Sequence, residues 1–160
     1  MTRALYIASP LGFSEAGRAF YPQFLAAIRE AGFDVLDPWA LTDAAQIDAV
    51  RALSDDARRR EAWRKLSHEI AERNQRAIDR SDGVVAVLDG PDVDSGTAAE
   101  IGYACARGKR IVGYRGDFRR TGDNEGVLVN LQVEYFIRAS GGEIVASTGE
   151  LVPVLRRVFV

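Results

Sequence analysis

The sequence predicts an α/β protein: a single-domain, flavodoxin-like or Rossmann-like three-layer sandwich with a five-stranded, mostly parallel sheet between helices. Strand and helix patterns alternate along the whole chain. Residues 83–88 (GVVAVL) form an unbroken apolar run, which is typical of a parallel strand buried on both faces. No linker, low-complexity segment or internal repeat interrupts the 160 residues, so we expect one domain over residues 1–160.

The first half of the chain is expected to supply two strands and two longer helices. In order, these are a strand at 4–8, a helix at 16–31, a strand at 34–37 and a charged helix at 55–79. Gly32 fits the C-terminal stop of the first helix, and Pro38 closes the second strand. Residues 39–58 are polar, rich in alanine and without a clear period, so they predict short helices or a flap over an active site.

The second half continues this alternation. We expect a strand at 83–88, a helix at 96–107, a strand at 110–113, a helix around 128–138, a strand at 143–145 and a terminal helix that carries Leu151 and Leu155. Gly108 ends the first of these helices, and a long loop at 114–126 precedes the second. Strands separated by helical crossovers pair in parallel, which is the basis of the fold prediction.

The most informative segment is residues 92–104 (DVDSGTAAEIGYA), which follow the apolar strand. In an open α/β sheet, ligands bind beyond the carboxyl ends of the strands, where this segment should lie. Glu100 is expected in the first turn of the next helix, where the positive helix end would favour its ionised form and make it a nucleophile. Asp92 and Asp94 precede it, and glycosyl chemistry needs paired carboxylates. The alternative is an ordinary exposed glutamate at a helix start.

The loop at residues 9–13 (SPLGF) follows the first strand and therefore opens on the same edge of the sheet. Its glycine would let a ligand approach the backbone closely, and Phe13 could stack on a flat ring. A plain turn with a buried aromatic residue is an equal alternative. The loop is neither a GxGxxG fingerprint nor a P-loop, which disfavours a dinucleotide or a nucleoside triphosphate as ligand.

Composition narrows the class of function. The net charge of −2 and the lack of an apolar run of about 18 residues favour neither nucleic acid nor a membrane as partner. The single cysteine, Cys105, and the absence of a visible signal peptide fit a reducing cytoplasm. Cys105 and the one histidine, His68, lie far apart, so we expect no metal site. Arg115, Arg119 and Arg120 of the long loop either touch a substrate or serve surface solubility.

Residues 94–104 (DSGTAAEIGYA) resemble the motif of the nucleoside 2-deoxyribosyltransferase family, and segments 6–8, 78–88 and 129–136 agree in order and spacing. Related N-glycosidases of nucleoside 5′-monophosphates share this motif, so it indicates the superfamily better than the reaction. The resemblance implies transfer of 2-deoxyribose between nucleobases by a retaining double displacement. It also implies that 2′-deoxynucleosides and free nucleobases are the small-molecule partners, and that neither a metal nor an organic cofactor is needed.

The resemblance assigns roles to individual residues. Glu100 would attack C1′ of the sugar and hold it as a covalent ester, and Tyr6 would hydrogen-bond and orient the Glu100 carboxylate. Asp94 and Asn130 would hold the sugar 5′-hydroxyl. In the family the residue at the Asn130 position reaches in from a neighbouring subunit, which implies a homo-oligomer with shared active sites.

Further substrate contacts are expected from Phe13, which would line the base pocket, and from Asp92, Gly96 and Asn74. Asn74 stands where some family members carry an aspartate that contacts the base and supplies its proton. An amide can hydrogen-bond the base but is not a practical general acid. Another group or bound water would then have to protonate the leaving base.

Two alternatives to the transferase stay open. A hydrolase of 2′-deoxynucleosides or their 5′-monophosphates would use the same residues, with water resolving the glycosyl ester. A carboxylate at Asp94 would repel a 5′-phosphate, which favours nucleosides. Against this, Ser95, Thr97 and the arginines of the long loop could still serve a phosphate. A non-catalytic nucleotide-sensing domain of the same architecture belongs to another class, but the intact set of Tyr6, Asp94 and Glu100 argues against it.

Overall fold

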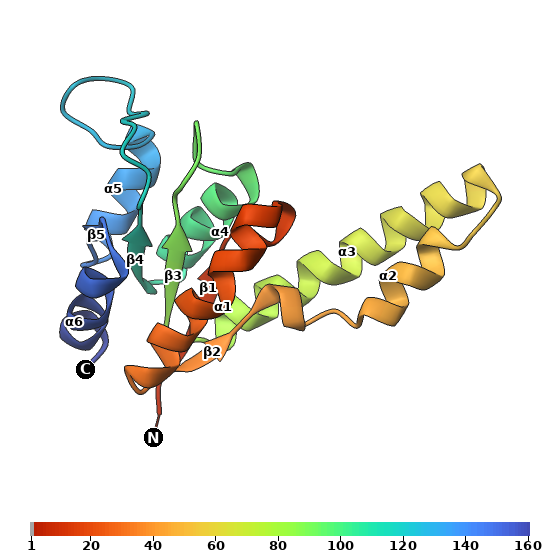
Figure 1. Ribbon diagram of the computed structural model, residues 1–160, viewed down its shortest axis with the longest axis horizontal. Helices are drawn as coiled ribbons and strands as arrows, with labels where there is room; N and C mark the ends of the chain where they lie inside the picture. The colour runs from red at the N-terminus through yellow and green to blue at the C-terminus, as the bar shows by residue number, and fades with distance from the viewer. Residues whose placement is uncertain (1) are drawn as a thin grey trace.

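The computed structural model describes residues 2–160, which contain one five-stranded sheet. Its strands are β1 (Ala4–Ala8), β2 (Asp34–Leu36), β3 (Gly83–Val87), β4 (Arg110–Tyr114) and β5 (Ile144–Val145). They lie in the order β2-β1-β3-β4-β5, and every neighbouring pair is parallel (Figure 1). All residues of the central strand β3 are buried, as its unbroken apolar run predicted. The predicted α/β class with a five-stranded parallel sheet is therefore confirmed.

Helices cover both faces of the sheet. They are α1 (Glu15–Glu30), α2 (Ala44–Arg51), α3 (Asp56–Arg80), α4 (Ser95–Ala106), α5 (Leu131–Ala139) and α6 (Thr148–Phe159), with 3-10 turns η1 (Leu11–Phe13) and η2 (Pro38–Ala40). The two cores show the expected three layers: one joins the sheet to α1 and α6, and the other joins it to α3, α4 and α5. Among residues 2–160, none of the helices has both the length and the apolar character needed to cross a lipid bilayer.

The alternation of side chains along β1 positions a residue of the site. Leu5 and Ile7 pack in the core with α1 and α6, whereas Tyr6 and Ala8 pack in the core with α3, α4 and α5. Tyr6 is fully buried and pairs in register with Val84 of β3. Its side chain is consequently directed to the same side of the sheet as α4.

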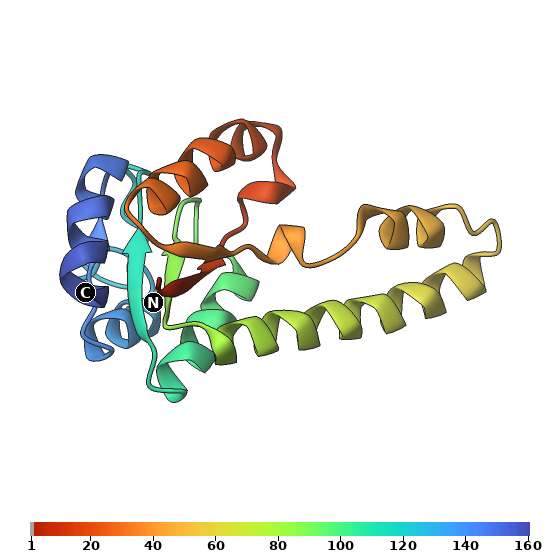
Figure 2. The same ribbon diagram turned by 90° about the horizontal axis from the view of Figure 1, so that it is seen from below.

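The pair formed by α2 and α3 extends from the sandwich. α3 has 25 residues, and its C-terminal part packs on the sheet through Ala77 and Ile78. α2 and the N-terminal half of α3 run side by side away from the other helices (Figures 1 and 2). Residues 39–58, for which the sequence predicted short helices or a flap, thus contribute most of η2 and all of α2.

α5 begins at Leu131, three residues later than expected. Asn130 ends the preceding loop, and its side-chain oxygen accepts hydrogen bonds from the backbone N–H groups of Gln132 at 3.0 Å and Val133 at 3.4 Å. Leu128, which was expected inside the helix, instead donates its N–H to the Glu134 carboxylate at 2.8 Å. Asn130 is therefore the N-cap of α5.

Candidate active site

Tyr6 and Glu100 meet although 94 positions of sequence separate them. The Tyr6 hydroxyl donates a 2.6 Å hydrogen bond to Glu100 Oε1. Burial, helped by the Glu100 carboxylate, holds the pKa of Tyr6 far above its usual range, so the phenol stays protonated and remains a donor. The pKa of Glu100 is raised to about 7, mainly by burial; hydrogen bonding to Tyr6 and Asn74 lowers it, and the Asp94 carboxylate raises it.

The position of Glu100 in its helix differs from the expectation. α4 begins at Ser95, so Glu100 lies in the second turn, and the first turn carries no acidic residue. The effect of the positive helix end fades beyond the first turn. The prediction that this end favours the ionised carboxylate is wrong, because burial outweighs it and raises the pKa. The Tyr6 hydroxyl, through its hydrogen bond, and the nearby Asn74 amide favour the ionised form instead.

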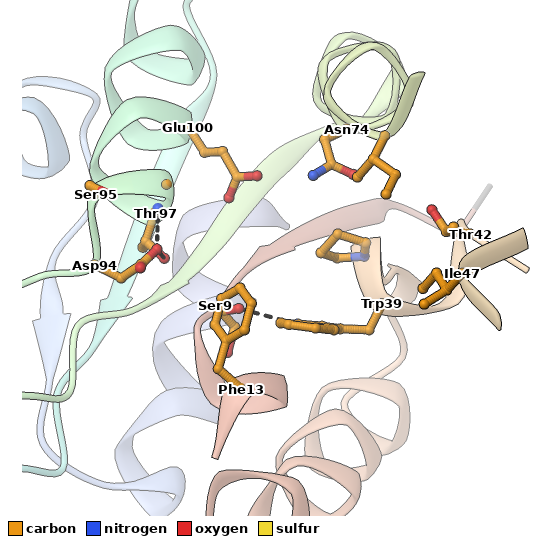
Figure 3. Close-up of a pocket in the computed structure, with 13 residues that line it drawn as sticks. Ser9, Phe13, Trp39, Thr42, Ile47, Asn74, Asp94, Ser95, Thr97 and Glu100 are labelled. Atoms are coloured by element: carbon orange, nitrogen blue, oxygen red, sulfur yellow. Dashed lines mark hydrogen bonds between the residues drawn. The ribbon is translucent and has the colours of Figure 1, made fainter. Parts of the chain in front are cut away.

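Asp94 lies at one end of a cleft beside Glu100 (Figure 3). It caps α4: its Oδ2 accepts hydrogen bonds from the backbone N–H of Thr97 at 2.9 Å and from the Thr97 hydroxyl at 3.2 Å. A Cβ at Gly96 would lie 3.1 Å from the same oxygen, so a larger residue would crowd this turn. Ser95, Gly96 and Thr97 line the cleft next to Asp94 and make this end polar.

The opposite end of the cleft is aromatic. The rings of Phe13 and Trp39 meet edge to face, with centroids 4.7 Å apart and planes at 81°. The Trp39 indole N–H donates to the carbonyl of Ser9 at 3.2 Å, and the Asp37 carboxylate accepts from the Trp39 backbone N–H at 3.0 Å. Gly12 lies against the indole, where a Cβ would be 2.4 Å from Trp39 Cε2. These contacts fix an aromatic surface that suits a flat heterocycle (Figure 3).

The segment before α2, α2 itself and α3 supply the outer wall. Ile47 and Ile70 are its apolar residues, and Thr42 and Asn74 are its polar ones. The amide nitrogen of Asn74 points toward Glu100 (Figure 3). Its Oδ1 is buried and has no hydrogen-bond partner within residues 2–160. The cleft has a volume of about 460 Å³, which is in the range of small-molecule sites.

The cleft brings together most of the residues predicted from the sequence, namely Phe13, Asn74, Asp94, Gly96 and Glu100, with Tyr6 behind Glu100. Phe13 is at the rim and is 73% exposed, rather than a buried aromatic of a plain turn. Asp92 and Asn130 do not line the cleft. Asp92 is exposed, and its carboxylate accepts from the N–H of Val93 at 2.7 Å.

Sequence reasoning missed part of the cleft wall, namely Trp39, Thr42, Ile47 and Ile70. The first three come from the segment without a clear period, and Ile70 lies in the predicted charged helix at 55–79, to which no other residue of the predicted site except Asn74 belongs. One signal was available for Trp39. It follows the strand at 34–37 almost directly, and the carboxyl ends of parallel strands meet at one edge of the sheet.

Arg115 lies in the interior of the protein. It is 2% exposed, and its guanidinium donates to the carbonyl oxygens of Leu88, Gly90 and Arg119. These carbonyls belong to the segments that follow β3 and β4, so Arg115 ties both segments together beside the motif that carries Asp94. The expectation that Arg115 touches a substrate or serves surface solubility is therefore wrong, because all its described contacts are internal carbonyls.

Comparison with known proteins assigns the chain to a family. The family model described as nucleoside 2-deoxyribosyltransferase matches residues 5–132, which include all of β1 except Ala4, the residues that line the cleft and the whole of α4. An uncharacterised protein of Schizosaccharomyces pombe is 32% identical over a match that covers 49% of this chain and 56% of the relative. The chain thus spans little more than half the length of that relative.

Solved structures share the fold. A conserved protein from Enterococcus faecalis V583 is 25% identical, with a TM-score of 0.72 over 98% of this chain and 99% of that chain. A 2-deoxyribosyltransferase from Bacillus psychrosaccharolyticus is 18% identical, with a TM-score of 0.64 over 93% and 90%. A CMP N-glycosidase from Clostridium botulinum is 19% identical, with a TM-score of 0.57 over 97% and 98%. Because the family model covers most of the sequence, the chain belongs to the nucleoside 2-deoxyribosyltransferase family.

Proposed function

We propose that this chain transfers 2-deoxyribose between nucleobases by a retaining double displacement in which Glu100 carries the sugar as a covalent ester. The observation that carries the proposal is the partly buried Glu100 carboxylate, which accepts a 2.6 Å hydrogen bond from Tyr6 in a cleft with a polar end and an aromatic end. A 2′-deoxynucleoside has the matching shape, because its hydroxylated sugar and flat base join at the carbon that a nucleophile must reach. The family is also named for this reaction.

The proposed reaction has two displacements at C1′. In the first, an oxygen of ionised Glu100 forms a bond to C1′, and the C1′–N bond breaks with its electron pair on the departing base. In the second, a nitrogen of another base forms a bond to C1′ and loses its proton to water, and the ester bond breaks and restores the carboxylate. This proton balances the one that the departed base anion takes up from water. Two inversions give net retention. Tyr6 orients the free carboxylate through a charge-assisted hydrogen bond.

Asp94 supports nucleosides over 5′-monophosphates as substrates. A carboxylate can accept a hydrogen bond from a 5′-hydroxyl but repels a phosphate. The arginines of the loop that follows β4 are engaged elsewhere: Arg115 binds backbone carbonyls, and Arg119 donates to the Asp117 carboxylate at 2.9 Å. Within residues 2–160, no lysine or arginine lines the cleft to neutralise a phosphate.

We also propose a homo-oligomer in which Asn130 of one copy reaches the cleft of another. In its own chain Asn130 does not line the cleft but caps α5. Next to it, α5 carries the apolar side chains of Leu131 and Tyr135, which are 49% and 62% exposed. Such exposed apolar side chains often mark an interface with another protein. Because they lie beside Asn130, contact with a second copy through them would carry Asn130 to the sugar site of that copy.

Chromatography after incubation with 2′-deoxyadenosine, with and without free hypoxanthine, tests the proposal. A new deoxynucleoside that requires hypoxanthine is the expected result. Glu100→Gln keeps the size of the side chain and an acceptor for Tyr6, and it should form no product. Glu143→Gln changes a half-buried carboxylate that lies outside the cleft and binds Arg157, so it serves as the matched control and should act as wild type. Substantial exchange by Glu100→Gln would contradict the assigned nucleophile.

Hydrolysis of the same bond is the second candidate. It is favoured by the exposed rim of the cleft, where Phe13 is 73% exposed and water has access. Water would then resolve the ester in place of a second base. Release of adenine at the same rate with and without hypoxanthine, and without an exchange product, would make the chain an N-glycosidase.

A further inference from the structure

The base end of the cleft has no acidic side chain among the residues that the structure describes. The titratable residues that line the whole cleft are Asp94 and Glu100, and both belong to the motif at the other end. The rest of the wall is aromatic or aliphatic, or carries an amide or a hydroxyl, as in Trp39, Asn74 and Thr42. Amides and hydroxyls donate hydrogen bonds but do not release a proton near neutral pH.

The charged groups behind this wall are bound to one another. Arg73 donates to Thr42 Oγ1 at 3.4 Å, to Gln46 Oε1 at 3.0 Å and to Glu69 Oε2 at 3.3 Å. Glu69 is held in this ion pair and does not line the cleft. A guanidinium does not act as a proton donor in catalysis. Neither group therefore supplies a proton to a departing base.

The lack of a proton donor at the base end affects which bases can depart. When the C1′–N bond breaks, its electron pair stays on the base nitrogen. A neutral base then departs as an anion unless an acid protonates it, whereas a base that already carries a positive charge departs as a neutral molecule. We infer that the cleft prefers N-glycosides of positively charged heteroaromatic bases, such as N7-alkylated purines; this inference rests on the proposed function.

Three further properties of the cleft suit a cationic base. The faces of Phe13 and Trp39 attract a cation through their π-systems. Both titratable lining groups are carboxyls and no cation lines the cleft within residues 2–160, so the local field favours positive charge. Asn74 lines the cleft and its buried Oδ1 has no hydrogen-bond partner within residues 2–160, so rotation of the amide would cost no hydrogen bond of this oxygen and would turn it toward an N–H donor of such a base.

The test compares 7-methyl-2′-deoxyguanosine with 2′-deoxyguanosine, which differ by one methyl group and one charge. Asn74→Asp adds an acid at the base end, and Asn74→Leu adds none at similar volume. Because general acid catalysis contributes at least about a hundredfold when well placed, Asn74→Asp should raise kcat on 2′-deoxyguanosine by about tenfold or more. It should give no gain on the methylated substrate, and Asn74→Leu should give no gain on either. An unchanged ratio of the two kcat values in Asn74→Asp would overturn the inference.

A binding measurement keeps the inference testable if Asn74→Asp does not fold. Glu100→Gln leaves both nucleosides intact, and calorimetry on this variant should give a Kd for the methylated nucleoside lower by about threefold or more. Equal or weaker binding of the charged nucleoside would overturn the inference. If the wild-type protein cleaves both nucleosides at similar rates, the preference for a charged base is overturned and the proposed function stands. If it cleaves neither nucleoside, both the preference and the proposed function are overturned.

Discussion

The hydrogen bond of 2.6 Å from the Tyr6 hydroxyl to Glu100 Oε1 joins the first strand of the sheet to the helix that carries the candidate nucleophile. Glu100 has a pKa of about 7 despite this bond, because burial penalises its charged form. The charged form is the one that attacks, whereas the neutral form is the one that the fold prefers. Activity and stability should therefore respond to pH in opposite directions.

The activity of the wild-type protein should rise with pH through about 7 as Glu100 ionises. Tyr6→Phe removes a hydrogen bond that lowers the pKa of Glu100, so the rising limb should move to higher pH. A hydrogen bond to a charged group contributes about 1.5–3 kcal/mol, so the rate near pH 7 should fall roughly 10–100-fold. The measurement is kcat/KM against pH for both proteins. Superimposable profiles would exclude this role of Tyr6.

The stability of the wild-type protein should fall as pH rises through the same range. The pKa of Glu100 is about 7 in the folded protein against an ordinary 4.5, so the folded state binds more protons between these values. The free energy of unfolding should drop across this window by up to about 3 kcal/mol. Glu100→Gln should abolish this part of the slope and unfold at higher urea concentration than wild type at alkaline pH. Urea titrations at acidic and alkaline pH, with Glu143→Gln as control, give the comparison.

Gly12→Ala should damage substrate binding. The added methyl would lie 2.4 Å from the Trp39 indole, so the aromatic surface has to move. We expect KM for nucleosides to rise by about tenfold, as for loss of a stacking contact, with a smaller change in kcat. Gly149→Ala is the matched control, because its Cβ would approach only Ser147 Oγ, at 3.8 Å. Similar steady-state constants for both variants would remove Trp39 from the base site.

Arg115→Met should destabilise the protein by about 2–4 kcal/mol, because one buried carbonyl group and two partly buried ones lose a charged donor. Arg115→Lys should recover only part of this, since an ammonium cannot reproduce the planar fork of donors. Arg120 is exposed, and Arg120→Met should leave the urea midpoint unchanged. A midpoint of Arg115→Met equal to that of Arg120→Met would contradict the structural role.

Asn130→Ser should lower activity while preserving the start of α5, because serine also caps helices. The two variants Asn130→Ser and Glu100→Gln can then be mixed and allowed to exchange subunits. In a mixed oligomer, one shared site combines Glu100 of the first variant with Asn130 of the second, so it has both native residues. Part of the wild-type activity should return. A mixture that stays as inactive as its components, in a protein that sediments as an oligomer, would place Asn130 outside the shared site.

The order of strands and helices could be predicted from the sequence because local patterns determine it. The unbroken apolar run of β3 can be buried only in the middle of a parallel sheet, and alternation with helices requires crossover connections. The first and last residues of the elements were predicted less accurately. α5 starts at Leu131 because the Asn130 side chain satisfies two backbone N–H groups, which its spacing alone does not reveal.

The candidate nucleophile and its motif were also accessible from the sequence, because Asp94, Gly96 and Glu100 lie close together in one turn and its helix. The raised pKa of Glu100 could not be predicted from the sequence. Its pKa depends on burial by distant segments and on hydrogen bonds from Tyr6 and Asn74. The aromatic wall likewise forms only when the loop after β1 brings the ring of Phe13 next to that of Trp39, with the ring centroids 4.7 Å apart.

The sequence by itself thus determined which elements form and which residue types stand at the carboxyl edge of the sheet, because periodicity and turn chemistry act over a few residues. The tertiary structure decided which of these residues share a cleft, and it placed Arg115 in the interior with its guanidinium on backbone carbonyls. It also decided that, among residues 2–160, no acidic side chain lies at the base end. These properties arise from burial and from contacts across tens of positions, and such long-range contacts leave no local pattern in a chain.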